Sequence, residues 1–253
     1  MKKHIHYTEV VSTNTLLKEM LLEDASLPHF MVVSADYQTS GRGQRENKWE
    51  SEQEANLLFS LLLRPEELKA TDAFAISRIV AVAIVEWLAK YVGNVSIKWP
   101  NDIYCGDKKI CGILIENSIM GSNLSTAIIG VGININQTSF SQFIPNPTSL
   151  QIETRNAYNT QEMLSEVLAE IELRYNAYFN GESEKINSLY HNLLYRLNTL
   201  AKFRIPVPCE SGTRVCEATI IGVEENGCLM LKHTEGEVCR YAFKEVEFII
   251  KSH

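Results

Sequence analysis

A glycine-containing loop carries much of the chemistry that the sequence suggests. It runs over nine residues from Gly41 to Trp49 and holds two glycines, three cations and a tryptophan. Glycines let backbone N–H groups approach a ligand closely, and Arg42 can donate two parallel hydrogen bonds to a carboxylate or phosphate. Trp49 adds an aromatic face that can cover a ring. The loop therefore predicts an anion site, although a solvated turn has similar features.

Other polar segments follow in order. They are Ser12–Asn14, Lys98–Asp102, Lys108–Glu116 and Gly130–Asn136. Each has a structural explanation of its own: a helix cap, an Asn-Asp turn, a solvated hairpin tip at Lys108–Lys109, and a strand whose glycines admit close packing while Asn134 and Asn136 face solvent. The functional interpretation is favoured because all the segments occur together.

These residues would suit the activation of a carboxylate by ATP. That reaction needs cations to bring two anions together, a site for adenine, and exclusion of water from the mixed anhydride. Arg42 and Lys109 could supply the charges, and Trp49 and Asn134 could hold the base. The Gly41–Trp49 loop could close over the site.

Hydrophobic periodicity predicts the elements that position these residues. We expect helices over 12–22, 74–91, 160–179 and 184–197, the first capped by Ser12–Asn14 and the second begun by Thr71-Asp72 and ended by Gly93. We expect strands over 30–35, 56–63 and 124–135, and paired strands over 95–99 and 109–117 with turns at Pro100-Asn101 and Gly106-Asp107. The loop would then lie between two buried strands.

The sequence pattern changes after Leu200. Short β-rich runs over 202–207, 213–223, 228–232 and 237–243 are divided by glycines, which predicts a small barrel or sandwich. We therefore expect a larger domain over 1–199 and a smaller β domain over 200–253.

Composition excludes several classes of protein. The 253-residue chain is 45% hydrophobic and 22% charged, as in ordinary globular proteins, and its net charge of −7 argues against a general binder of nucleic-acid backbones. The apolar segment 74–91 is interrupted by Arg78 and Glu86, so we expect no membrane span. The six cysteines lack C-x-x-C spacing, which favours reduced thiols over a metal site, and no secretory signal is evident. We expect a cytoplasmic protein.

In this order and spacing the segments resemble the catalytic region of biotin protein ligases. The resemblance runs from about Ser12 through the C-terminal segment. It implies an α+β catalytic domain around a mixed sheet, similar to class II aminoacyl-tRNA synthetases, followed by an SH3-like β-barrel. It also implies ATP, Mg²⁺ carried mainly by nucleotide phosphates, and biotin as substrates, with no separate metal site. The protein partner would be the biotin carboxyl carrier domain of a biotin-dependent carboxylase or decarboxylase. We expect no DNA and no membrane partner, and a homodimer is left open.

The resemblance also implies roles for individual residues. Ser12, Thr13 and Asn14 would contact the biotin head group, and Gln38 its ureido ring. The biotin-binding set is completed by Gly41, Arg42, Gly43, Gln44, Lys109 and Gly112, and the nucleotide-binding set comprises Arg42, Trp49, Lys98, Lys109 and Asn134. Lys109 and Arg42 would be catalytic by neutralising the approaching anions, and Asp102 by orienting the carrier lysine or accepting its proton.

Two features depart from the family pattern. Many members have arginine where this chain has Gln44, so the adenylate would be held less tightly unless Arg45 and Lys48 compensate. Some bacterial members begin with a DNA-binding domain, whereas Ser12–Asn14 lies near residue 1 here, so we expect the single-function form.

Two alternatives stay open. A lipoate ligase or octanoyl transferase would share the fold and the acyl-to-lysine chemistry. A transferase would use a cysteine, for which Cys105 and Cys111 are the candidates near the site. A non-catalytic binding module with an adaptor surface is the other alternative, but it leaves the polar residues of the first 136 positions unexplained.

Overall fold

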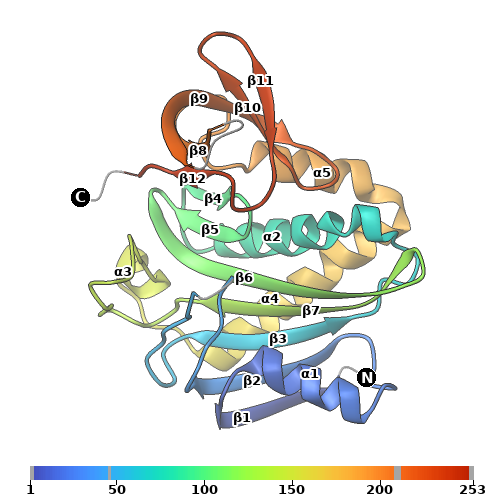
Figure 1. Cartoon of the computed structure of the whole chain (residues 1–253). Helices are drawn as coiled ribbons and strands as arrows, with labels where there is room; N and C mark the ends of the chain where they lie inside the picture. Colours follow the sequence, from blue (N-terminus) through green and yellow to red (C-terminus); the bar gives the residue numbers. More distant parts are fainter. Residues whose placement is uncertain (1–2, 45–46, 208–211, 251–253) are drawn as a thin grey trace.

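The computed structural model describes residues 3–44, 47–207 and 212–250. The part before residue 200 contains β1 (His4–Val10), α1 (Thr13–Glu23), β2 (Met31–Gln38), β3 (Leu57–Leu63), η1 (Ala70–Asp72), α2 (Phe74–Leu88), β4 (Val95–Lys98), β5 (Asp102–Cys105), β6 (Lys108–Met120), β7 (Asn123–Ile133), α3 (Leu150–Thr154), α4 (Thr160–Ala177), η2 (Tyr178–Glu182) and α5 (Ser183–Asn192). It continues with β8 (Leu200–Pro206), β9 (Thr213–Val223), β10 (Leu229–His233), β11 (Val238–Tyr241) and β12 (Glu247–Phe248) (Figure 1). The fold is a mixed α+β fold with two separate sheets.

The larger sheet has seven strands in the order β1-β2-β3-β7-β6-β5-β4. β1 and β2 run parallel, and the other neighbouring strands pair antiparallel. β6 and β7 form a long hairpin in which Gly112 lies opposite Gly132 and Leu114 lies opposite Gly130. Two of the polar segments of the sequence therefore lie side by side in this sheet.

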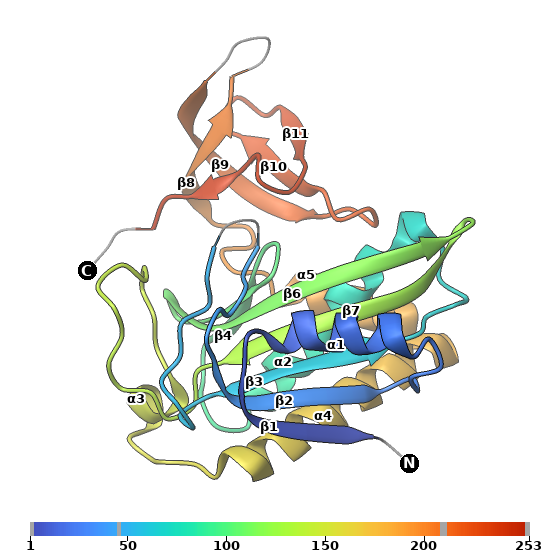
Figure 2. The ribbon, with the colours of Figure 1, turned by 60° about the horizontal axis from the view of Figure 1, so that its bottom comes forward.

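Helices cover the two faces of this sheet. α1 lies on one face, where Leu17 packs with Met31, Leu62 and Ile128. α2, α4 and α5 lie on the other face (Figure 2), and α2 is buried almost along its whole length. None of the helices in the described part of the chain combines the length and the apolar character that a bilayer span needs.

The smaller sheet is antiparallel, with five strands in the order β11-β10-β9-β8-β12. It begins at Leu200, next to the predicted domain boundary, and the division into two domains stays a prediction. It contacts the first part of the chain through the indole N–H of Trp99, which donates to the Gly227 carbonyl at 2.9 Å. Arg78 of α2 donates to the Glu224 carbonyl at 2.6 Å. The turn between β9 and β10 is therefore tied to the first part of the chain by one buried and one partly buried hydrogen bond.

The predicted helix boundaries were wrong in detail. Ser12 occupies the N-cap position of α1, but its side chain makes no capping hydrogen bond. Thr71 and Asp72 lie in η1, and α2 begins after Ala73 without a side-chain cap. Burial of α2 against the sheet supplies the stability that a cap would add. α2 also ends at Leu88, before Gly93, and the residue with positive φ beyond it is Asn94.

The expected strands over 95–99 and 109–117 are not direct neighbours, because β5 lies between β4 and β6. The predicted helix over 184–197 ends at Asn192, since the backbone of Leu193 and Tyr195 bonds to Ile97 of β4 instead. β1, β5, α3 and β12 were not predicted. They are short or partly exposed elements whose position depends on pairing with distant parts of the chain.

Candidate functional site

The floor of the candidate site is a network of buried polar side chains at the start of α1. The side-chain carbonyl of Gln38 accepts hydrogen bonds from the backbone N–H and the hydroxyl of Thr13, at 2.8 and 3.2 Å. The Ser60 hydroxyl lies 2.8 Å from the Thr13 hydroxyl and 2.5 Å from Oδ1 of Asn14. Ser12 is also buried and lines the same cavity. Paired in this way, the polar groups of the floor hold one orientation.

Asn14 also connects this floor to the glycine loop. Its amide Nδ2 donates to Oε2 of Glu116 at 3.0 Å. The guanidinium of Arg42 donates to both oxygens of the same carboxylate, each at 3.2 Å. The side chains of Arg42 and Glu116 are 45% and 26% exposed, so this is a partly solvated ion pair. The loop cation therefore faces a carboxylate of the protein itself.

Sequence reasoning missed Ser60 and Glu116. Ser60 is the one hydroxyl in the apolar strand Leu57–Leu63, and it is fully buried. A lone hydroxyl in a buried strand indicates a specific partner, because an unpaired buried hydroxyl is costly. Glu116 ends the apolar run of β6, and nothing in the sequence indicates that it meets both Asn14 and Arg42.

The glycines of β6 and β7 make room for side chains that pack flat on the sheet. A Cβ at Gly112 would lie 2.9 Å from Cζ3 of Trp49, and one at Gly132 would overlap the same ring. A Cβ at Gly130 would overlap the amide of Asn14. Any larger residue at these positions would displace Trp49 or Asn14. The glycines thus admit side chains of the site, and not another backbone.

Lys109 points into the site, whereas its neighbour Lys108 points outward. The Lys109 ammonium lies 2.6 Å from Oδ1 of Asp102, and these side chains are 29% and 15% exposed. Lys108 is 51% exposed and pairs with Glu153 at 3.3 Å. The alternation of a β-strand separates the two lysines. The solvated-tip interpretation thus fits Lys108 but not Lys109.

Lys98 approaches the other oxygen of Asp102. Its ammonium lies 3.8 Å from Oδ2, and burial lowers the pKa of Lys98 while the Asp102 carboxylate opposes that shift. The same ammonium lies 4.9 Å from the ring centre of Phe248 in β12, and 5.3 Å from that of Tyr104. The smaller sheet thus contacts Lys98, which lines the second cavity of the site described below.

A central cavity of about 130 Å³ lies among these groups. Its lining includes the predicted residues Ser12, Thr13, Asn14, Gln38, Arg42, Gly43, Gln44, Trp49, Asp102, Lys109 and Gly112. Gly41 is not in this lining but is buried beside it, hydrogen-bonded through its carbonyl to the N–H of Trp49 at 2.9 Å. The structure thus brings the predicted biotin-binding residues together.

A second cavity of about 430 Å³ shares Trp49, Asp102 and Lys109 with the first. Lys98 and Asn134 line it, with Phe140, Phe143, Ile144, Pro145 and Pro147. The Asn134 amide donates to the Thr148 carbonyl at 2.8 Å, and its buried Oδ1 has no hydrogen-bond partner among the described residues. A buried acceptor of this kind is suited to a donor on a ligand. The apolar loop over 140–147 was not foreseen as a wall of the site.

Asn136 does not face solvent, as the strand interpretation would require. Its amide donates to the Tyr158 carbonyl and accepts from the Tyr158 N–H, at 2.8 and 2.9 Å. This exchange holds the chain after β7 and explains why an asparagine stands there.

The described part of the glycine loop is a narrow hairpin. Arg42 and Lys48 form an antiparallel bridge, and the Gly43 N–H donates to the Asn47 carbonyl at 2.7 Å. Arg45, expected to compensate for Gln44, and Glu46 lie outside the described residues. Gln44 lines the central cavity. The expected ordering of residues 40–48 by a ligand stays a prediction.

The candidate nucleophilic cysteines are poorly placed for acyl transfer. Cys111 is fully buried, and burial raises the pKa of its thiol. Burial also raises the pKa of the Cys105 thiol, which lies 3.5 Å from the Gly93 carbonyl. A nucleophilic cysteine needs a lowered pKa. Neither thiol has one.

Across residues 3–44, 47–207 and 212–250, no group of three or more His, Cys, Asp or Glu side chains is arranged to hold a metal ion. The donor set near Lys109 is instead cationic and amide-rich, which suits an anionic ligand that brings its own metal.

Comparisons with known proteins show the family of this chain. The family model described as "Biotin/lipoate A/B protein ligase family" matches residues 7–134. The chain is 30% identical over 241 residues to the bifunctional ligase/repressor BirA of Bacillus spizizenii, covering 93% of this chain and 71% of that protein. It is 28% identical over 211 residues to the biotin–[acetyl-CoA-carboxylase] ligase of Paracoccus denitrificans, covering 81% of this chain and 85% of that protein.

The fold has a close structural counterpart. The biotin protein ligase of Aquifex aeolicus, solved in complex with biotin and ATP, superposes with a TM-score of 0.79 at 26% sequence identity. The match covers 99% of this chain and all of the other. Sequence and structure agree, and the chain belongs to the biotin/lipoate A/B protein ligase family.

Proposed function

We propose that this protein is a biotin protein ligase. It activates biotin with ATP to biotinyl-5′-AMP and transfers the biotinyl group to a lysine of a biotin carboxyl carrier protein. The observation that carries the proposal is that one cavity is lined both by amides and hydroxyls, at Thr13 and Gln38, and by the cations Lys109 and Arg42. The biotin and ATP complex of the Aquifex aeolicus enzyme, which shares the fold, supports this function.

The floor would bind the biotin head group. A ureido ring both donates and accepts hydrogen bonds, and the floor offers the Gln38 and Asn14 amides with the hydroxyls of Ser12 and Thr13. Buried polar groups paired with such a ring reject ligands that lack it. Gly112 lets Trp49 lie flat on the sheet beside the valeryl chain of the ligand.

Lys109 and Arg42 would act in the first step. A biotin carboxylate oxygen attacks the α-phosphorus of ATP, a C–O–P anhydride forms, the bond from the α-phosphorus to the bridging oxygen breaks, and pyrophosphate leaves. Cations placed where negative charge concentrates stabilise such a transition state. Lys109 is already held by the Asp102 carboxylate at 2.6 Å, so little reorganisation is needed.

Asp102 would act in the second step. The neutral amine of the carrier lysine attacks the acyl carbon, an amide forms, and AMP leaves with the electrons of the acyl C–O bond. The proton released from the nitrogen would pass to Asp102, which lines both cavities. In this step, after pyrophosphate has left, Asp102 would release its contact with Lys109 to take the proton.

The second cavity would hold the adenine. Trp49 gives an aromatic face, and the unpartnered Oδ1 of Asn134 suits an exocyclic amine. Lys98 would lie near the phosphates. Mg²⁺ would be held mainly by the nucleotide phosphates.

We also propose a more specific fold for the two sheets, a carrier partner and a location for the enzyme. The larger sheet would be of the class II aminoacyl-tRNA synthetase type, and residues 200–253 an SH3-like barrel that forms a second domain. The carrier would belong to a carboxylase, as the name of the Paracoccus denitrificans relative suggests. We further propose a cytoplasmic enzyme that binds no DNA, with homodimerisation left to measurement.

The lipoate ligase or octanoyl transferase alternative is less well supported. The Paracoccus denitrificans relative and the Aquifex aeolicus structure named above are biotin ligases. The raised pKa values of Cys105 and Cys111 also argue against a cysteine-based transferase. An assay of ATP–pyrophosphate exchange with biotin, lipoate and octanoate separates the alternatives. We expect exchange with biotin alone, and equal exchange with lipoate would contradict the proposal.

A further inference from the structure

Glu116 occupies an unusual place, because one carboxylate of β6 serves both the floor and the loop. The Glu116 carboxylate accepts a hydrogen bond from Asn14 Nδ2 at 3.0 Å. It also accepts two hydrogen bonds from the Arg42 guanidinium, each at 3.2 Å. Arg42 is the cation to which the proposed function assigns the biotin carboxylate and the phosphate. The loop cation thus has an anion of the protein as its partner before any substrate anion arrives.

The two partners of Glu116 differ in burial. Asn14 is buried, and its Oδ1 accepts from Ser60 at 2.5 Å, so its amide is held at both ends. Arg42 is 45% exposed on a loop, and exposed ion pairs are weak and screened by salt. The guanidinium can therefore leave Glu116 while the Asn14 contact stays.

We propose that Glu116 is a positioning residue that acts as an internal competitor: it holds Arg42 in the empty site, and a substrate anion must displace it. This inference rests on the proposed function. A ligand carboxylate that binds Arg42 must break the Arg42–Glu116 pair, and any contact made only in the free enzyme weakens binding by its own strength. The loop cation is thereby kept in place over the cavity, at a cost in affinity for anionic ligands.

The proposal predicts a charge-selective effect of Glu116→Gln. The glutamine keeps an oxygen for Asn14 but loses the charge that holds Arg42. We expect biotin to bind about two- to fivefold more tightly, the range that exposed ion pairs allow. The primary amide of biotin, which has no carboxylate, should bind within twofold of wild type. A purely structural role for Glu116 would weaken both ligands.

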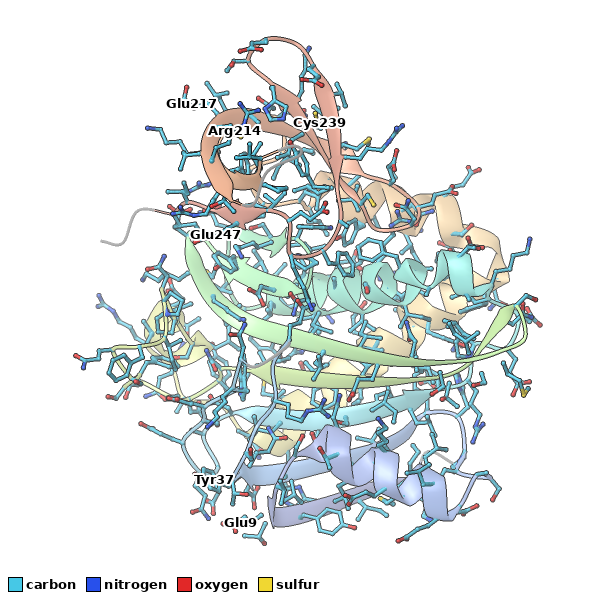
Figure 3. The ribbon with its side chains drawn as sticks, in the orientation of Figure 1. Glu9, Tyr37, Arg214, Glu217, Cys239 and Glu247 are labelled. Atoms are coloured by element: carbon cyan, nitrogen blue, oxygen red, sulfur yellow. The ribbon has the colours of Figure 1, made fainter. Side chains whose placement is uncertain are left out.

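The experiment is isothermal titration calorimetry of biotin and biotin amide into the full-length protein at low salt. The matched control is Glu217→Gln, which removes a carboxylate on the smaller sheet (Figure 3) that pairs with Lys202 at 3.9 Å, and it should change neither affinity. In an Arg42→Gln background, Glu116→Gln should have no effect on biotin.

Three results would overturn the inference. They are weaker binding of both ligands by Glu116→Gln, an unchanged biotin affinity, or a gain that persists without Arg42, which would indicate direct repulsion. Failure of the wild-type protein to bind biotin at all would instead contradict the proposed function. A wild-type protein that binds biotin, with no gain in Glu116→Gln, would contradict this inference alone.

Discussion

Two cations face the same cavity, and the protein holds them in different ways. Lys109 lies on a strand, and its backbone bonds to the Asn146 carbonyl and the Thr148 N–H at 2.7 and 2.9 Å. Its side chain contacts Asp102 at 2.6 Å, largely shielded from solvent. Arg42 lies on the glycine loop and contacts Glu116 from a more exposed position.

The difference separates two tasks. A charge that stabilises a transition state works best when its position is set before the reaction, and Lys109 meets that condition. A charge that must admit a substrate and then cover it needs a weak partner and a backbone that can move. Arg42 has a partly exposed partner, and motion of its loop is predicted from the glycines. We therefore expect Lys109 to govern the rate and Arg42 to govern binding.

The largest expected effect is on Lys109, the cation that lies on a strand. Lys109→Ala should lower the rate of adenylate formation on the order of 10²–10³-fold, because it removes a preorganised charge from the transition state. The measurement is ATP–pyrophosphate exchange with biotin, with circular dichroism to confirm folding. Lys108→Ala is the matched control, because that side chain points outward to Glu153 and should leave the rate nearly unchanged. Near-normal exchange by Lys109→Ala would show that the strand-borne cation is not the catalytic one.

The next prediction compares how much a side chain of the floor and one of the loop each contribute to the free energy of unfolding. Ser60→Ala should lower the free energy of unfolding by about 1–3 kcal/mol, because it leaves buried polar atoms of Thr13 and Asn14 without this partner. Arg42→Ala should lower it by less than about 1 kcal/mol, since its ion pair is partly exposed. Urea denaturation measures both. Equal losses would mean that the loop is as much a part of the folded core as the floor.

The smallest effect sharpens the account of the loop. Gln44 lines the central cavity, where an added cation would attract the adenylate phosphate. Gln44→Arg should reduce release of free biotinyl-adenylate by about two- to fivefold, the range of a partly exposed charge contact. The measurement is adenylate released per turnover in the absence of carrier. Release equal to that of wild type would show that this position does not control retention.

Proteolysis tests the loop directly. We expect cleavage within residues 40–48 to slow when biotin is added, because binding must hold a backbone that glycines leave free to rearrange. A cut elsewhere on the surface is the control. Identical rates with and without biotin would show that ligand does not order this segment.

Much of the fold followed from local pattern. Apolar runs predicted α2, β3 and β7 as buried elements, and the greater length of the run at α2 favoured a helix there. β1, β5 and β12 escaped prediction. β5 and β12 are short, and β1 is as long as β3 but largely polar and partly exposed, so each strand depends on pairing with a neighbour. The caps were wrong for a related reason: α2 is held by the core, so its end need not carry a cap.

For the candidate site too, local sequence features were predictable and contacts between distant residues were not. Residue types and spacing pointed to Arg42, Lys109 and Asn134, because charge, amide chemistry and glycine freedom are properties of single residues. Ser60 and Glu116 were missed, because their importance lies in what they contact. Glu116 lies 102 residues from Asn14 and 74 from Arg42 along the chain, and only the fold brings the three together.

The sequence by itself therefore determined the family, the larger elements and the groups that can carry charge. The tertiary structure alone decided which lysine of the Lys108–Lys109 pair faces the cavity and which carboxylate each cation meets. It also decided that the smaller sheet reaches the site through Phe248. The physical reason is that hydrophobic pattern is local, whereas an ion pair or a hydrogen bond depends on a distance between remote residues that only the packed sheet sets.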